Sequence, residues 1–154
     1  MDRKTVETRA ATSSLYWAFA RIGGGVGCYA HNWAWRLRGV LDSLVGGVGP
    51  RRGRRHPEDV ALHETIDFWR VSAVAPGHRF QLAAEMKLPG RAWLEWEIVD
   101  RDDHRELIQT AYFRPRGLFG RLYWYAMLPF HLFIFRQMAE RIGRAAETHV
   151  PIPD

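Results

Sequence analysis

The segment from Asp67 to Phe113 constrains the fold more than any other, because it contains four apolar runs separated by three short turn signals. The turn signals are Pro76-Gly77, Pro89-Gly90 and Asp102-Asp103, residue types that favour turns and interrupt strands. Within each run, apolar and polar residues alternate with a period of two, which is typical of a strand with one buried face and one wetter face. The segment therefore predicts four antiparallel strands connected as a meander.

The phase of the alternation predicts which side chains face the interior. Glu85, Glu95 and Glu97 fall on the opposite face and are expected to be exposed. Two polar residues, Asp67 and Gln109, are in phase with the apolar side chains, so each is expected to need a hydrogen-bonding partner. The inner face otherwise comprises Trp69, Val71, Ala73, Phe80, Leu82, Ala84, Met86, Leu94, Trp96, Ile98, Leu107, Ala111 and Phe113.

A long helix is predicted after the meander, from Gly117 to about Glu147. Only 14 residues, nearly all apolar, separate Arg121 from Arg136, which is fewer than the ~20 that a membrane span needs, so we expect this helix to pack on the sheet. Pro129 lacks a backbone donor and predicts a kink near Tyr125. The apolar stripe of the helix comprises Trp124, Met127 or Leu128, His131, Phe135, Met138 and Ile142.

The N-terminal part predicts a first strand over residues 5–11 and two short helices, the first capped by Ser13 or Ser14 and the second by Asn32. The 154 residues, 47% of them hydrophobic, suit one α+β domain spanning residues 1–154. Its antiparallel sheet is expected to wrap on the long C-terminal helix. The second short helix has one apolar stripe, which we expect to join the core: Trp33, Leu37, Val40, Leu41 and Leu44.

The net charge of +5 is carried almost wholly by arginine, because Lys4 and Lys87 are the only lysines. A basic surface favours anionic partners. The densest cluster could clamp a phosphate or carboxylate, or it could be a charged edge strand that resists aggregation. The run is too short to predict nucleic-acid binding. It comprises Arg51, Arg52, Arg54 and Arg55.

Cys28 is the single cysteine, which excludes an internal disulfide and fits a reducing cytoplasm. Residues 1–9 are charged and lack the apolar core of a signal peptide, so a cytoplasmic location is expected. The histidines do not fall at metal-ligand spacing, and Cys28 has no basic neighbour in sequence that would activate it as a nucleophile.

The glycine-rich segment 25–30 fits the G-x-G-x-x-A pattern of dinucleotide sites. However, a short helix rather than a strand precedes it, and no second βα unit follows. We therefore interpret the segment as a connection between two helices and expect no cofactor.

Large rings on the meander and the last helix predict a cavity of at least ~300 Å³ that suits a planar apolar ligand, although the same rings could simply fill the space. His131 could bind a ligand or act as a general acid or base, because imidazole titrates near neutral pH, or it could be satisfied by a neighbour. The candidate ligand-binding residues are Asp67, Trp69, Met86, Leu94, Trp96, Gln109, Phe113, Trp124, Met127 and His131.

Four sequence runs resemble the DUF2867 family, a domain of unknown function: WAWRLRGVLDSLVGGVGPRRGRRHP, DFWRV, AEMKLPGRAWLEWE and QTAYFRPRGLFGRLYWYAMLPFHLFIF. The resemblance spans residues 24–146. Members of the family are similar to START-like (SRPBCC, helix-grip) domains, which implies a curved antiparallel sheet that grips a long helix. Many are fused behind a short-chain dehydrogenase-like domain that binds a nicotinamide cofactor. Because the resemblance starts close to Met1, we expect no such domain here.

Three function classes remain open. The first, which we rank highest, is a binding module that holds a small hydrophobic or aromatic metabolite between the sheet and the last helix. The second is a cofactor-free cyclase, isomerase or dehydratase in which Asp67, Gln109 or His131 moves protons. The third is an auxiliary subunit that docks on a separate short-chain dehydrogenase.

The segment from Leu122 to Phe135 is apolar almost all round. This predicts that one side of it stays uncovered and either pairs two subunits or touches a membrane. We rank a peripheral membrane contact below a homodimer.

Overall fold

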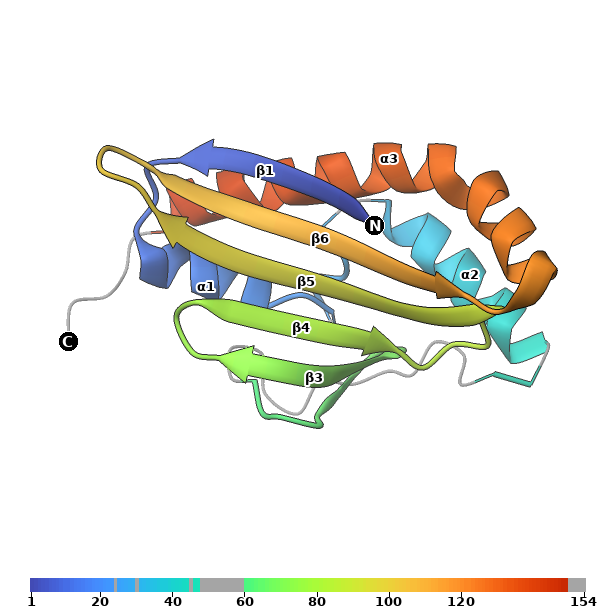
Figure 1. Ribbon diagram of the computed structural model, residues 1–154. Helices are drawn as coiled ribbons and strands as arrows, with labels where there is room; N and C mark the ends of the chain where they lie inside the picture. Colours follow the sequence, from blue (N-terminus) through green and yellow to red (C-terminus); the bar gives the residue numbers. More distant parts are fainter. Residues whose placement is uncertain (24, 30, 45, 48–59, 150–154) are drawn as a thin grey trace.

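The structure is a computed structural model that describes residues 1–149 apart from residues 24, 30, 45 and 48–59. In this part of the chain, six strands form one curved antiparallel sheet in the order β1-β6-β5-β4-β3-β2, and the helices cover one of its faces (Figure 1). The elements are β1 (Asp2–Thr8), α1 (Thr12–Ala20), α2 (Asn32–Leu44), β2 (Thr65–Ile66), β3 (Trp69–Ala75), β4 (Arg79–Ala84), β5 (Gly90–Asp100), β6 (Arg105–Pro115) and α3 (Gly117–Thr148).

The predicted meander is confirmed as β3 to β6, with a turn at each of the three predicted sites. The first strand lies at Asp2–Thr8 instead of residues 5–11, and it pairs with β6 along its whole length. β2 is the additional edge strand, at Thr65–Ile66. Two residues carry no periodicity, so no alternation could predict it.

The inner face follows the predicted phase on β4, β5 and β6 but changes phase within β3. Val71 lies opposite Leu82, whereas Ala73 lies opposite Gln81, so Ser72 is an extra residue in the strand. Beyond this bulge, Val74 rather than Ala73 packs against the core. The predicted inward orientation of Ala73 is therefore wrong, because one inserted residue reverses the alternation.

Glu95 lies on the outer face of the sheet, as its phase predicts, but it is only 7% exposed. Its Oε2 atom accepts hydrogen bonds from Gln81 Nε2 at 2.7 Å and Arg79 Nη2 at 2.6 Å. The Ser72 hydroxyl donates to Gln81 Oε1 at 2.9 Å. Long polar side chains on the neighbouring strand β4 thus cover the carboxylate, and the expectation that Glu95 is exposed is wrong.

α1 packs against β4 and β5, beside α3 on the same face of the sheet, and forms one end of the core. Leu15, Ala18 and Phe19 are fully buried. The Phe19 ring stacks on Phe80 at 6.1 Å and on Trp96 at 6.4 Å between ring centroids. Large rings therefore fill this end of the space between sheet and helices.

The predicted helix caps are not used. α1 starts after Ala11, which makes no side-chain capping bond, and the Ser14 hydroxyl instead donates to the carbonyl of His149 at 3.2 Å. α2 begins at Asn32, whose Oδ1 accepts from the backbone N–H of Cys28 at 3.0 Å. Both polar side chains therefore stabilise contacts outside the helix that they were expected to cap.

α3 is buried mainly along its second half, which lies against β1, β6 and α1. Pro129 lies inside the helix, and the first half bends away from the line of the second (Figure 1). The bend agrees with the predicted kink, since a proline leaves the carbonyl of Tyr125 without its helical donor. In the first half only Gly120 is buried, whereas the second half buries Phe135, Met138, Ala139, Ile142, Gly143 and Ala146.

α2 packs through a different stripe from the predicted one. Trp35, Gly39 and Asp42 lie on its packed side at i, i+4 and i+7. The Trp35 ring contacts Phe68 at 5.7 Å, and an Asp42 carboxylate oxygen accepts from the Lys87 backbone N–H at 2.8 Å. These contacts fix the helix with its other side outward. The predicted core stripe is wrong, because each of its members is at least half exposed: Trp33, Leu37, Val40, Leu41 and Leu44.

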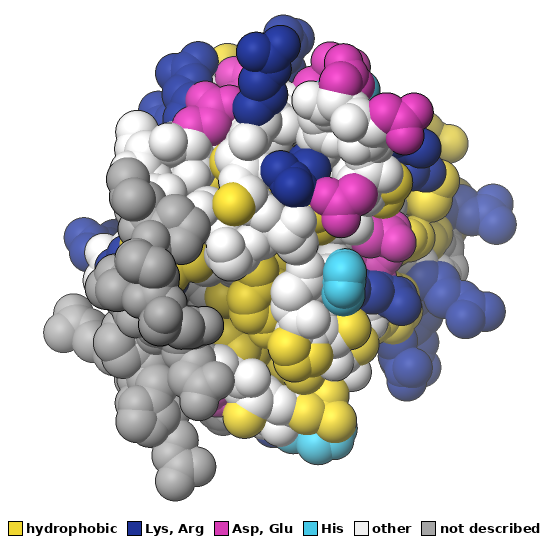
Figure 2. Space-filling model, turned by 90° about the vertical axis from the view of Figure 1, so that its left-hand side faces the viewer, with side chains coloured by type: hydrophobic (Ala, Val, Ile, Leu, Met, Phe, Trp, Pro, Cys, Tyr) yellow, Lys and Arg dark blue, Asp and Glu magenta, His cyan; other side chains and the backbone are white. Residues whose placement is uncertain are grey.

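Figure 2 shows the end of the molecule that carries the β5–β6 turn, where acidic and basic side chains lie together. Arg105 Nε contacts Asp100 Oδ1 at 2.7 Å, and Arg101 Nη2 contacts Glu106 Oε2 at 2.8 Å. Arg101 and Arg105 are therefore each balanced by a carboxylate in or beside the same turn.

Gln109 joins the sheet to α3 inside the core. Its Oε1 accepts from Trp96 Nε1 at 2.9 Å, and its Nε2 donates to the carbonyl of Phe135 at 3.0 Å. Both Gln109 and Trp96 are almost completely buried. The predicted need of Gln109 for a partner is thus met within the chain.

We predict that Gln109→Leu lowers the free energy of unfolding by about 1–3 kcal/mol, because the buried Trp96 N–H then has no acceptor. Urea denaturation measures this change. Thr110→Val, on the outer face of the same strand, serves as the control and should have a smaller effect. Equal stability of Gln109→Leu and the wild-type chain would contradict a structural role for the amide.

Candidate functional site

A cavity of about 300 Å³ lies between the sheet and the helices, at the end opposite α1. Space remains on the sheet side because three of the residues on the inner face there are small, namely Ala84, Ala92 and Ala111. At the α1 end of the same face, Phe80 and Trp96 fill the space instead. The alternation of the strands thus fixes the inner face, and residue size along that face determines where space remains.

The mouth of the cavity lies between α2 and α3. Four wall residues are exposed, namely Trp33, Leu37 and Leu41 of α2 and Phe130 of α3. All other wall residues are buried or half-buried. An incoming molecule therefore meets apolar side chains before it reaches the interior.

The described wall is almost wholly apolar. It contains no carboxylate, guanidinium, amine or amide side chain, and no serine or threonine. His131 is the one wall residue whose side chain ordinarily titrates near neutral pH. Its ring packs edge-on against Trp124 at 5.3 Å and against Phe135 at 5.1 Å. The other polar atoms that the wall side chains offer belong to tyrosine and tryptophan.

Seven of the ten predicted ligand-binding residues are brought together on this wall. They come from β3, the β4–β5 loop, β5, β6 and α3, which shows that the meander and the helix meet as the sequence predicted. Contact of these residues with a ligand stays a prediction. They are Trp69, Met86, Leu94, Phe113, Trp124, Met127 and His131.

The other three predicted residues lie away from the wall. Trp96 and Gln109 are hydrogen-bonded to each other inside the core. Asp67 lies in the turn between β2 and β3 with a φ of +52°. This backbone conformation is not that of a strand, so the alternation from which its inward orientation was predicted does not apply to it. The expectation that Gln109 stands on the cavity wall is therefore wrong.

Sequence reasoning missed the contribution of α2. Trp33, Ala34, Trp35, Leu37 and Leu41 all line the cavity, on a helix whose apolar stripe was assigned to the closed core. A stripe signals that a face is apolar but does not state what covers it. Two tryptophans within three residues at the start of this helix were the available signal, since aromatic side chains are common in ligand sites.

Three backbone donors in and beside the glycine-rich segment are used within the chain. Gly23 N–H donates to the carbonyl of Gly27 at 2.7 Å, and Gly27 N–H donates back to Gly23 at 3.2 Å. Cys28 N–H donates to Asn32 Oδ1. These closed pairs support the interpretation of the segment as a connection between helices. The predicted anion-binding arginines Arg51, Arg52, Arg54 and Arg55 lie outside the described residues.

Comparison with protein families matches residues 1–138 to DUF2867, described as a protein of unknown function. The chain belongs to the DUF2867 family. The match starts earlier than the resemblance over residues 24–146 suggested, and it includes β1 and α1. No curated protein matches this DUF2867 chain. None of the helices in the described part of the chain has the length and apolarity to cross a membrane.

Solved structures show that this DUF2867 chain has a helix-grip fold. Norcoclaurine synthase from Thalictrum flavum, in truncated form, aligns with a TM-score of 0.56 at 11% identity, over 97% of this chain and 94% of that one. Protein CV1439 from Chromobacterium violaceum aligns with a TM-score of 0.52 at 12% identity, over 96% of this chain and 97% of that one. The predicted START-like architecture is confirmed.

Cys28 is buried in the core of the DUF2867 domain. Burial, and then the negative charge of Asp67, raise the pKa of its thiol to about 12. The thiol therefore stays protonated at neutral pH and is a poor nucleophile. Between about pH 9 and pH 12 the unfolded chain loses this proton while the folded chain keeps it, so the free energy of unfolding falls as the pH rises through this window.

We predict that iodoacetamide modifies Cys28 in the folded protein at pH 8 about 10³-fold more slowly than in urea, because the raised pKa lowers the thiolate fraction by about that factor. Mass spectrometry of timed samples measures both rates. Labelling at similar rates in the two states would contradict the buried, protonated thiol.

Proposed function

We propose that this DUF2867 domain binds a small hydrophobic molecule, with a planar ring system, in the cavity between the sheet and the helices. The observation that carries the proposal is an apolar cavity of about 300 Å³ whose described wall has no charged side chain apart from an ionisable histidine. This volume is at the low end of small-molecule sites. An engineered apolar cavity of roughly 150 Å³ holds one benzene, so about two aromatic rings suit the enclosed space, and a third can lie in the open mouth between α2 and α3.

The shape of the wall supports a flat ligand. The rings of Phe113 and Trp124 are stacked, with centroids 5.3 Å apart and an angle of 10° between planes. Such a pair offers an extended flat surface, and aromatic rings stack offset on one another with a gain of about 0.5–1.5 kcal/mol beyond area burial. His131, in contact with Trp124, supplies a polar group for one substituent of the ligand.

A binding role fits the wall better than the enzymatic alternative. Norcoclaurine synthase is an enzyme by name, and its similarity to this chain concerns the fold. General acid–base catalysis commonly needs a donor and an acceptor whose pKa values are tuned apart. The described wall residues include no carboxylate or amine side chain that could act as the second group. We therefore rank a cofactor-free cyclase, isomerase or dehydratase second, and a subunit of a separate dehydrogenase third.

We predict that N-phenyl-1-naphthylamine binds the protein with increased probe fluorescence and quenched tryptophan emission, because it would lie among the tryptophan rings of the wall. Ala111→Trp should weaken this binding at least about tenfold, since the larger side chain occupies the cavity. Ala75→Trp, an alanine exposed at the far end of β3, is the matched control and should leave the affinity unchanged.

Circular dichroism should show that both variants are folded. If folded Ala111→Trp binds the probe as tightly as the wild-type chain does, the probe sits outside the cavity and the proposal fails. It also fails if the wild-type protein does not bind the probe.

A further inference from the structure

The outer side of α3 in its first half is an apolar surface that stays largely exposed in the described part of the chain, although the His31 ring contacts Phe133 at its end. Leu118, Leu122, Tyr125, Pro129 and Phe133 recur at i, i+4, i+7, i+11 and i+15, so they lie on one face of the helix, over roughly 22 Å. The four large side chains among them are 58–73% exposed. The opposite face of the same segment lines the cavity.

A helix that is apolar on both faces is normally buried or in contact with lipid. α2, on the other side of the mouth, also turns its apolar stripe outward. We call the exposed apolar side chains of α2 and of the first half of α3 the mouth surface: Trp33, Leu37, Val40, Leu41, Leu44, Leu118, Phe119, Leu122, Tyr125, Phe130, Leu132 and Phe133.

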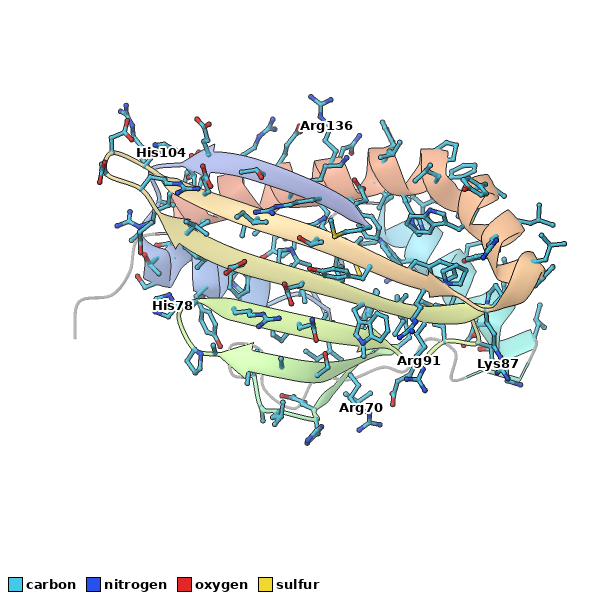
Figure 3. The ribbon with its side chains drawn as sticks, viewed as in Figure 1. Arg70, His78, Lys87, Arg91, His104 and Arg136 are labelled. Carbon is cyan, nitrogen blue, oxygen red and sulfur yellow. The ribbon has the colours of Figure 1, made fainter. Side chains whose placement is uncertain are left out.

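The charged side chains beside the mouth surface are almost all basic. No acidic residue occurs between Glu106 and Glu140, a stretch that contains the first half of α3. Lys87 and Arg91 lie at the same end of the molecule, where the β4–β5 loop meets α2 and the start of α3 (Figure 3). On α2 the acidic residue is Asp42, which is buried.

Four exposed arginines at this end make no ion pair within the described part of the chain: Arg91, Arg114, Arg116 and Arg121. By contrast, the arginines of the β5–β6 turn are each paired with a carboxylate. This end of the molecule therefore carries positive charge that no ion pair in the described part of the chain balances, close to large apolar side chains.

We propose that the mouth surface docks on an anionic lipid bilayer, with its apolar side chains in the headgroup–acyl boundary and its arginines on lipid phosphates. Apolar and aromatic side chains beside basic ones are the combination that binds such a surface without spanning it. A symmetric dimer through the same surface would bring the arginines of two copies together, whereas anionic lipid neutralises them. For this surface we therefore rank an anionic membrane above a second copy of the chain, the reverse of the sequence-based ranking.

Docking in this orientation turns the mouth of the cavity toward the bilayer. This step rests on the proposed ligand-binding function, whereas the docking itself does not. The ligand class it assigns is an apolar ring compound that partitions into membranes, which would pass between lipid and cavity with little exposure to water.

Co-sedimentation with vesicles tests the docking. The full chain should bind vesicles of phosphatidylcholine with roughly 30% phosphatidylglycerol, and it should bind pure phosphatidylcholine at least about tenfold more weakly. Raising the salt from about 0.1 M to about 1 M shortens the Debye length from ~10 Å to ~3 Å and should release most of the protein.

Two double variants with the same change in net charge show whether vesicle binding depends on the arginines beside the mouth surface or on the overall charge of the protein. Arg116→Glu with Arg121→Glu, beside the mouth surface, should weaken binding to anionic vesicles at least about tenfold. Arg9→Glu with Arg144→Glu, both exposed and outside the mouth surface, should change it less than about threefold. Leu122→Glu with Phe133→Glu tests the apolar contribution and should also abolish binding.

The proposal would be overturned by equal binding to neutral and anionic vesicles or by no vesicle binding at all. It would also be overturned if both arginine double variants lost vesicle binding to the same extent. A stable dimer, seen by light scattering, that Leu122→Glu dissociates would overturn it as well, since a second copy would then cover the surface. Two variants distinguish a failure of docking from a failure of the ligand site. Ala111→Trp should lose binding of N-phenyl-1-naphthylamine and still bind vesicles. Arg116→Glu with Arg121→Glu should still bind N-phenyl-1-naphthylamine and lose binding to vesicles.

Discussion

The contact between the second half of α3 and the sheet is the constraint on which the rest of the structure depends. Gln109 ties the sheet to the helix through the carbonyl of Phe135, and Met138 and Ile142 are buried against the strands beyond it. Because this half is fixed, the first half extends past the filled core. The alanines on the sheet there leave the cavity open, and Pro129 lies where the helix changes from packed to exposed. The packing of the second half of α3 on the sheet thus accounts for both the cavity and the uncovered surface above it.

Strand alternation was sufficient to predict the meander, most of its inner face and the sheet residues that line the cavity from that face, because burial of one sheet face forces a period of two. The alternation gave the wrong orientation beyond Ser72, where a β-bulge interrupts the period of two. It gave the wrong exposure for Glu95, because neighbouring side chains cover this polar group. It failed for α2 for a different reason. An apolar stripe identifies the face that avoids water, and on this helix that face borders the mouth of a cavity instead of the core.

The distribution of charge and the distribution of apolar side chains point to the same end of the molecule. Ion pairs balance the β5–β6 turn, while the mouth carries exposed rings and basic side chains. Soluble monomers rarely keep large contiguous apolar patches without a function. The proposed ligand site and the proposed docking on anionic lipid together give both features one explanation, which is the exchange of a hydrophobic compound.

The methionines provide the most direct test of the central claim that the cavity is a ligand site. Met86 and Met127 lie on its wall, whereas Met138 is in the core behind it and Met1 is at the N-terminus. In a ¹³C-methyl-methionine NMR titration with N-phenyl-1-naphthylamine, ring currents from a ligand in the cavity should shift the signals of Met86 and Met127. Those of Met1 and Met138 should stay close to their positions in the free protein. Unchanged Met86 and Met127 signals in a protein saturated with the probe would contradict the account.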